Sequence, residues 1–83
     1  MPPALLRPSA HERLRSLVDR MIDSWVCWRE ACEDVRSAYA RWGQCKAAQR
    51  DLAFASYCAA LEREDQAARV YSMHAERVRE ASA

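Results

Sequence analysis

Large apolar residues recur along residues 14–42 at spacings that alternate between four and three without a break. Because an α-helix completes a turn about every 3.6 residues, this spacing places the side chains on one stripe. Such a stripe is typical of a helix that packs lengthwise against another helix. It consists of Leu14, Val18, Met21, Trp25, Trp28, Cys32, Val35, Tyr39 and Trp42. We therefore predict a helix over about residues 10–42 with a coiled-coil-like seam.

Capping signals mark both ends of this helix. Ser9 and Glu12 form a capping box, in which the Ser9 hydroxyl accepts from the Glu12 amide and Glu12 returns a bond to Ser9. Gly43 is the only glycine and stands where a helix commonly ends in the left-handed conformation. All three prolines precede Ser9, so we expect residues 1–8 to form a flexible arm before a single domain at 9–83.

A second apolar stripe follows the glycine and predicts a second helix over about residues 46–80, after a turn at about 43–45. Its members are Ala53, Phe54, Tyr57, Ala60, Leu61, Ala67, Ala68, Tyr71, Ala75 and Val78. The start of this helix is weakly marked. Gln44 and Cys45 are poor caps, whereas Asp51 would cap a shorter helix.

Folding the chain at Gly43 would set large side chains on the first helix opposite small ones on the second. The pairs at equal levels would be Trp28 with Ala60, Trp25 with Leu61, Val18 with Ala67 or Ala68, and Leu14 with Tyr71. Glu64 interrupts the second stripe, and Arg20 or Arg29 would be its partner. We therefore expect an all-α antiparallel two-helix hairpin. One continuous helix with a shifted heptad frame is the alternative.

A chain of 83 residues and 9.5 kDa buries only a modest core, yet this one has more apolar surface than one partner helix covers. The surplus is Leu17, Ile22 and Val26 on the first helix and a second association stripe on the other helix, Cys45, Ala48, Leu52, Ala55, Ala59, Val70 and Met73. We expect a protein–protein interaction module that dimerises into a four-helix bundle or pairs with a related helical chain. The expected core and interface anchors are Leu14, Val18, Met21, Trp25, Trp28, Val35, Tyr39, Trp42, Tyr57, Leu61 and Tyr71.

A basic, aromatic hairpin tip indicates an alternative function. Its basic residues are Arg36, Arg41, Lys46 and Arg50. Together with Tyr39 and Trp42 they could grip phosphates and stack on bases, so the tip would bind nucleic acid or another polyanion. A simpler explanation is that positive charge near the C-terminal end of the first helix stabilises that end through the helix dipole. The net charge of the whole chain is only +1, which gives no general attraction to nucleic acid or membrane.

His11 and His74 fall near the open end of the predicted hairpin and are weak candidates for a metal site. Zinc sites need three or four ligands, and the sequence has no paired motif such as HxxxH or CxxC. The four cysteines, Cys27, Cys32, Cys45 and Cys58, are too scattered for a disulfide framework. Metal or redox sensing is therefore a third hypothesis, and we expect no cofactor. The sequence lacks a nucleophile–base pair and a glycine-rich phosphate loop, so we expect no enzymatic activity.

No stretch of the sequence resembles a signal peptide or reaches the ~18–20 apolar residues that a membrane-spanning helix needs. We therefore expect a cytoplasmic protein, or one exported by a signal-independent route. Arg outnumbers Lys twelve to one and alanine is abundant. This bias indicates a GC-rich genome, such as an actinobacterial one.

Trp42-Gly43 lies at the midpoint of a short chain without a signal peptide. In these features the chain resembles the Trp-x-Gly helical hairpins secreted by type VII systems, which are short two-helix proteins that dimerise into four-helix bundles. The family motif has one residue between Trp and Gly, whereas here they are adjacent. The family's export signal is a Tyr followed four residues later by an acid, and neither Tyr57 nor Tyr71 has that acid. The resemblance therefore implies the hairpin and its dimer, and it leaves export in question.

Overall fold

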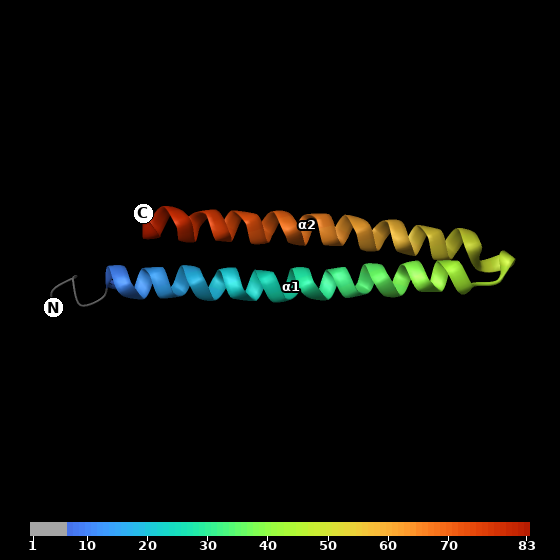
Figure 1. Cartoon of the computed structure of the whole chain (residues 1–83), viewed down its shortest axis with the longest axis horizontal. Helices are drawn as coiled ribbons and strands as arrows, with labels where there is room; N and C mark the ends of the chain where they lie inside the picture. Colours follow the sequence, from blue (N-terminus) through green and yellow to red (C-terminus); the bar gives the residue numbers. More distant parts are fainter. Residues whose placement is uncertain (1–6) are drawn as a thin grey trace.

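The computed structural model describes residues 7–83, which form two long helices packed side by side and joined at one end (Figure 1). Helix α1 spans Ala10–Gln44 and α2 spans Arg50–Ser82, with a short 3-10 helix, η2 (Ala47–Gln49), between them. The predicted all-α antiparallel hairpin is confirmed, and the alternative of one continuous helix is wrong. Most of the predicted N-terminal arm, residues 1–6, lies outside the described residues. Neither helix in the described part of the chain has a stretch long and apolar enough to cross a membrane.

The beginning of α1 follows from its first residues. Ser9 is the N-cap, in an extended conformation, and its hydroxyl accepts a hydrogen bond from the Glu12 amide over 3.0 Å. This bond satisfies one of the amide groups that a helix leaves unpaired at its N-terminus. The Arg13 guanidinium donates to the Pro8 carbonyl over 2.8 Å, and this bond holds Pro8 against the first turn of α1. The predicted capping by Ser9 is therefore confirmed, whereas the predicted return bond from Glu12 to Ser9 is not among the hydrogen bonds of residues 7–83.

The hairpin turns later than predicted. Gly43 remains helical, and no residue in the described part of the chain adopts a positive φ. The chain instead reverses at Cys45 and Lys46, which are extended, with φ −75° and ψ 159°, and φ −70° and ψ 154°. The Gln49 amide donates to the Lys46 carbonyl over 2.9 Å and closes the 3-10 turn. The predicted left-handed glycine was wrong, because two extended residues make the reversal.

The later turn changes which residues of the two helices lie opposite each other. Trp28 was expected opposite Ala60, but its ring stacks on Tyr71 with the ring centroids 5.7 Å apart. Leu14 was expected opposite Tyr71, but it lines a hollow with Ala81. The predicted register was therefore wrong. It placed the reversal too early and so matched each residue of the first helix with one too near the tip.

Only part of the predicted α1 seam faces α2. The residues of α1 that are buried or half-buried along the helix contact repeat at heptad spacing and are Leu14, Leu17, Met21, Ser24, Trp28, Ala31, Val35, Ala38 and Trp42. Two predicted seam residues, Trp25 and Tyr39, instead keep 45 % and 58 % of their surface exposed. The two helices meet on the side of α1 that carries Ser24 and Ala38, because small side chains let the helices approach closely.

The two helices bury little between them. Among the described residues only Ser24, Ala38 and Ala60 are fully buried, and no large side chain is. The residues of α2 that line the seam, and most of which are half-buried, are Ala53, Tyr57, Ala60, Glu64, Ala67, Tyr71, His74 and Val78. A small hairpin with so little buried apolar volume is marginally stable in isolation.

Candidate interaction surface

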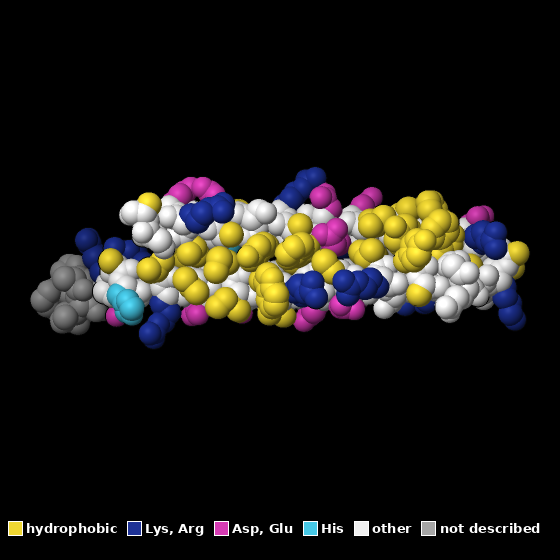
Figure 2. All heavy atoms as spheres, viewed as in Figure 1, with side chains coloured by type: hydrophobic (Ala, Val, Ile, Leu, Met, Phe, Trp, Pro, Cys, Tyr) yellow, Lys and Arg dark blue, Asp and Glu magenta, His cyan; other side chains and the backbone are white. Residues whose placement is uncertain are grey.

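One side of the hairpin carries an uncharged row of residues on each helix. Within each row the members are seven residues apart, which keeps them on one face of the helix. We call the two rows together the apolar flank; they are Val18, Trp25, Cys32 and Tyr39 on α1, and Phe54, Leu61, Ala68 and Ala75 on α2. Figure 2 shows hydrophobic side chains over both helices on this face of the hairpin.

The two rows lie side by side. Across the two helices the ring of Trp42 lies 4.9 Å from Phe54 and the ring of Tyr39 lies 5.5 Å from Tyr57, which places Tyr39 and Phe54 at about the same level. Because the helices are antiparallel and both rows advance by seven residues, the other levels follow from this one. From the tip to the open end the levels are Tyr39 with Phe54, Cys32 with Leu61, Trp25 with Ala68, and Val18 with Ala75. These levels replace the predicted pairing of Trp25 with Leu61.

The large side chains of the apolar flank are partly open to solvent, whereas its other members, Val18, Cys32, Ala68 and Ala75, are half-buried. Phe54 is 45 % exposed and Leu61 is 38 % exposed, and the half-exposed Ile22 widens the flank on α1. Its four levels span about 32 Å along the hairpin. Contiguous exposed apolar patches commonly mark interaction sites.

Four aromatic rings form a packed block at the tip end of the apolar flank. Tyr57 stacks on Trp42 with centroids 5.6 Å apart and meets the edge of Tyr39 at 5.5 Å. The ring of Phe54 lies 4.9 Å from Trp42. Stacked and edge-to-face pairs of this kind contribute about 0.5–1.5 kcal/mol each beyond the area that they bury. The tip is therefore held together by ring packing.

A carboxylate lies in the seam near the middle of the apolar flank. The Trp28 indole N–H donates to Glu64 Oε2 over 2.7 Å, and both side chains are partly buried. The partner of Glu64 is therefore an indole, rather than the predicted Arg20 or Arg29. A hydrogen bond to a partly buried charge is strong and directional, so it favours one register of α1 against α2.

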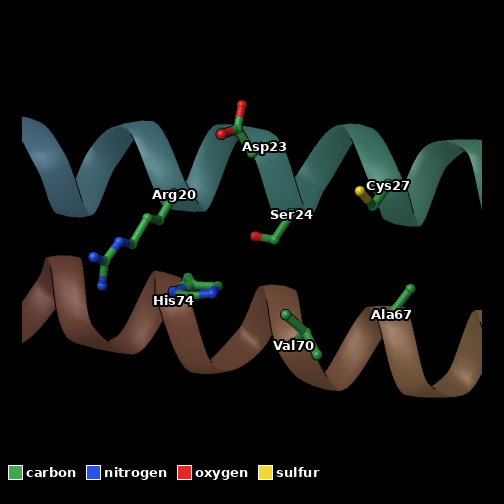
Figure 3. Close-up of a pocket in the computed structure, with 7 residues that line it drawn as sticks. All are labelled: Arg20, Asp23, Ser24, Cys27, Ala67, Val70 and His74. Atoms are coloured by element: carbon green, nitrogen blue, oxygen red, sulfur yellow. The ribbon is translucent and has the colours of Figure 1, made fainter.

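The opposite side of the hairpin is largely charged. The corresponding rows there are Arg13, Arg20, Cys27, Asp34 and Arg41 on α1, and Ser56, Arg63, Val70 and Arg77 on α2. Figure 3 shows a groove on this side, in which Arg20 of α1 reaches toward His74 of α2 beside Ser24. The Ser24 hydroxyl donates to its own helix, at the Met21 carbonyl, over 2.8 Å. Apart from Val26 on the outer face of α1, the exposed large apolar residues away from the flank, Leu52, Val70 and Met73, all belong to α2, whereas the apolar flank combines apolar rows from both helices.

The structure does not bring the candidate metal and redox residues together. His11 lines a hollow near Ala81, whereas His74 lies across from Arg20, about 13 Å further along α1 at the helical rise. All four cysteines are unpaired thiols. Over residues 7–83, no group of three or more His, Cys, Asp or Glu side chains is arranged to hold a metal ion.

The predicted anion-binding residues are spread over the tip. Arg36 forms an ion pair with a glutamate one turn earlier, over 2.5 Å. Arg41 and Arg50 line two different hollows. The ring of Trp42, expected to stack on bases, packs on Tyr57 instead. The tip therefore offers scattered positive charges, with Trp42 engaged in the fold and Tyr39 58 % exposed.

The predicted second association stripe of α2 lies apart from the apolar flank. Leu52 is 73 % exposed and lines a hollow with Arg41, while Val70 lines the groove on the charged side. Of the other members, Met73 and Ala55 are exposed and Ala59 is half-buried. Helix α2 therefore exposes large apolar residues on two sides, and those of the apolar flank, Phe54 and Leu61, are the ones that the sequence pattern placed in the hairpin seam.

Helix α1 carries two overlapping heptad seams. They share Leu14, Met21, Trp28, Val35 and Trp42. The first seam adds small residues such as Ser24 and Ala38 and faces α2, whereas the second adds the α1 row of the apolar flank. Two seams on one helix are typical of bundles with more than two helices.

No protein-family model, curated protein or solved structure matches the chain, so its function is inferred from this surface.

Proposed function

We propose that this protein is a helical protein–protein interaction module that associates with a second copy of itself through the apolar flank. Two hairpins packed in this way form a four-helix bundle. The observation that carries the proposal is the second heptad seam of α1. Its large side chains, Trp25 and Tyr39, have the spacing of a helix contact but are about half exposed.

The length of the apolar flank suits such an association. Its four levels span about 32 Å, along which each helix presents one row at the spacing of a helix contact. Ile22 adds to the flank on the α1 edge. Full burial of a large apolar side chain contributes about 1.5–3 kcal/mol, and the flank offers several such side chains that are half-exposed in the single hairpin.

The regular spacing of the apolar flank suits a second copy as the partner. Its α1 row and its α2 row both advance by seven residues, so two flanks have the same helical repeat. Pairing of one surface with itself across a two-fold axis covers both flanks and leaves neither exposed.

The proposal is tested by the mass of the untagged protein in solution, measured by light scattering under reducing conditions. We expect a mass near twice 9.5 kDa. Trp25→Glu should reduce the mass to that of one chain, because it places a charge in the centre of the contact. Val26→Glu, at the next residue on the outer face and 42 % exposed, is the matched control and should remain dimeric.

Loss of helix in Trp25→Glu, read by circular dichroism, would leave its mass uninformative. The melting temperature of the unmodified protein then provides the test. An associating chain melts at a higher temperature as its concentration rises, and a monomer does not. A single-chain mass, or a melting temperature independent of concentration, would overturn the proposal.

A further inference from the structure

We infer that Glu64 weakens self-association near neutral pH and links it to proton uptake, because two Glu64 carboxylates meet at the centre of the dimer. This inference rests on the proposed function. A single acid lies at the centre of an otherwise uncharged surface, so any partner that covers the apolar flank must also cover this acid.

Glu64 is central in both directions of the apolar flank. Along α2 it falls between Leu61 and Ala68, the two middle members of that row. Across the flank, its hydrogen bond to Trp28 spans the seam between the two rows. Figure 2 shows acidic side chains among hydrophobic ones near the middle of this face. Neither row of the flank carries a charge, and the seam row of α2 that borders it has one, at Glu64; this row is Tyr57, Glu64, Tyr71 and Val78.

Only one oxygen of the Glu64 carboxylate is satisfied within the hairpin. Oε2 accepts from the Trp28 indole N–H over 2.7 Å. Oε1 has no hydrogen-bond partner in residues 7–83, and it is not one of the buried polar atoms that lack a partner, so it contacts solvent. Burial of this oxygen in an apolar contact removes its water and supplies no hydrogen bond in return, which opposes association.

The neighbouring charges do not neutralise Glu64 within the hairpin. The ion pairs of residues 7–83 do not include it, and Asp65 is engaged with Arg69 over 2.8 Å. Arg29 is exposed on the outer edge of α1, and Arg63 lies on the charged side of the hairpin. The titratable groups that remain around the carboxylate are the Cys32 thiol of α1 and the phenol of Tyr71, which stacks on Trp28.

A two-fold dimer brings the two Glu64 carboxylates together. When one flank fully covers the other, the axis lies in the contact and passes through the centre of both flanks, whichever way round the copies lie. Packed helices are only about 8–10 Å apart, so side chains at this centre meet. Two carboxylates that share one desolvated site do not both stay ionised. One takes up a proton from solvent, and its hydroxyl then donates a hydrogen bond to the open oxygen of the other.

Proton uptake makes association stronger as the pH falls. A carboxylate open to water is ionised near neutral pH, so the dimer binds one more proton than two separate hairpins. Its affinity should therefore rise by up to about tenfold per pH unit on acidification toward the ordinary range of a glutamic acid. His11 and His74 also titrate in this range. They lie toward the open end, and His74 is about 15 Å from Glu64 along α2.

Glu64→Gln tests this inference, because it removes the charge and keeps an amide oxygen that can accept from Trp28. At about pH 7.5 the variant should dimerise about tenfold or more tightly than the unmodified chain. Between about pH 7.5 and about pH 5.5 its affinity should change less, since only the histidine contribution remains. Glu62→Gln is the matched control. It removes the same charge from an exposed position outside the flank and should leave the dissociation constant within about twofold.

Sedimentation equilibrium gives the dissociation constants, and circular dichroism verifies the helix content of both variants. A Glu64→Gln dimer no tighter than the unmodified one would overturn the inference and leave the association intact. Protein that is monomeric at every pH would overturn the proposed function itself.

A second measurement needs no variant and decides the question if Glu64→Gln loses helix. The heat of dimer dissociation, compared in two buffers of different ionisation enthalpy, counts the protons exchanged. We expect about one proton taken up per dimer formed at about pH 6. Association without proton uptake would overturn the role of Glu64.

Discussion

Trp28 and Glu64 join the two helices through a hydrogen bond of 2.7 Å between the indole N–H and a carboxylate oxygen. The same indole ring stacks on Tyr71 at 5.7 Å. Trp28 therefore contacts α2 in two ways, and both contacts specify the same register. An apolar seam tolerates sliding by a heptad, whereas a directional bond to a partly buried carboxylate does not.

Removal of the Trp28 donor should destabilise the hairpin. Trp28→Phe keeps an aromatic ring but leaves the Glu64 carboxylate without its donor, so we expect a loss of about 1–3 kcal/mol in the free energy of unfolding. Urea denaturation followed by circular dichroism measures it. Trp28→Phe combined with Glu64→Leu should cost less than the single change, because both polar partners are then absent. Equal costs for the single and double variants would contradict the coupling.

Replacement of the only glycine should stabilise the protein. Gly43 is helical with φ below zero, and a Cβ built on it would meet nothing within 4 Å. Gly43→Ala should therefore raise the free energy of unfolding by about 0.5–1 kcal/mol, through the higher helix propensity of alanine. Thermal and chemical denaturation at fixed protein concentration measure the change. A destabilised variant would show that the position needs a left-handed or crowded backbone after all.

Enlargement of a buried alanine should separate the helices. Ala38 is 2 % exposed where α1 and α2 meet, so Ala38→Leu should lower the free energy of unfolding by about 1–3 kcal/mol through overpacking. Ala40→Leu is the control, because Ala40 is exposed two residues further along the same helix. The two variants can be compared by their denaturation midpoints. A similar small effect at both positions would place the seam on a different side of α1.

Much of the fold could be predicted from the sequence, because its signals are local. Ser9 has the chemistry of an N-cap and acts as one. Large apolar residues seven apart, from Leu14 to Trp42, form the row that both seams of α1 share. The turn could not be predicted in the same way. Glycine is a strong signal for a left-handed residue, whereas the extended backbone of Cys45 and Lys46 is open to any side chain and leaves no signal.

The choice between the two seams of α1 was the main obstacle to predicting the surface. Residues such as Ser24 and Trp25 are neighbours, so both seams satisfy the same heptad spacing. A pattern of apolar residues favours the seam with Trp25, since it has the larger side chains. The hairpin instead uses the seam with Ser24 and Ala38, because short side chains permit close approach. The sequence thus identified the α1 row of the apolar flank but placed it in the contact with α2, where the structure leaves Trp25 and Tyr39 about half exposed.

The connection at Cys45 and Lys46 has a consequence for what the tip can accommodate. Its backbone needs neither a glycine nor a cis proline, and the block formed by Trp42, Phe54 and Tyr57 holds the helix ends on either side. Cys45 is half-buried and its thiol donates to the Trp42 carbonyl over 3.3 Å, whereas the side chain of Lys46 is exposed. Short foreign peptides grafted between Lys46 and Ala47 should therefore have little effect on the hairpin. The tip is thus a site at which recognition peptides can be inserted, by evolution or by design.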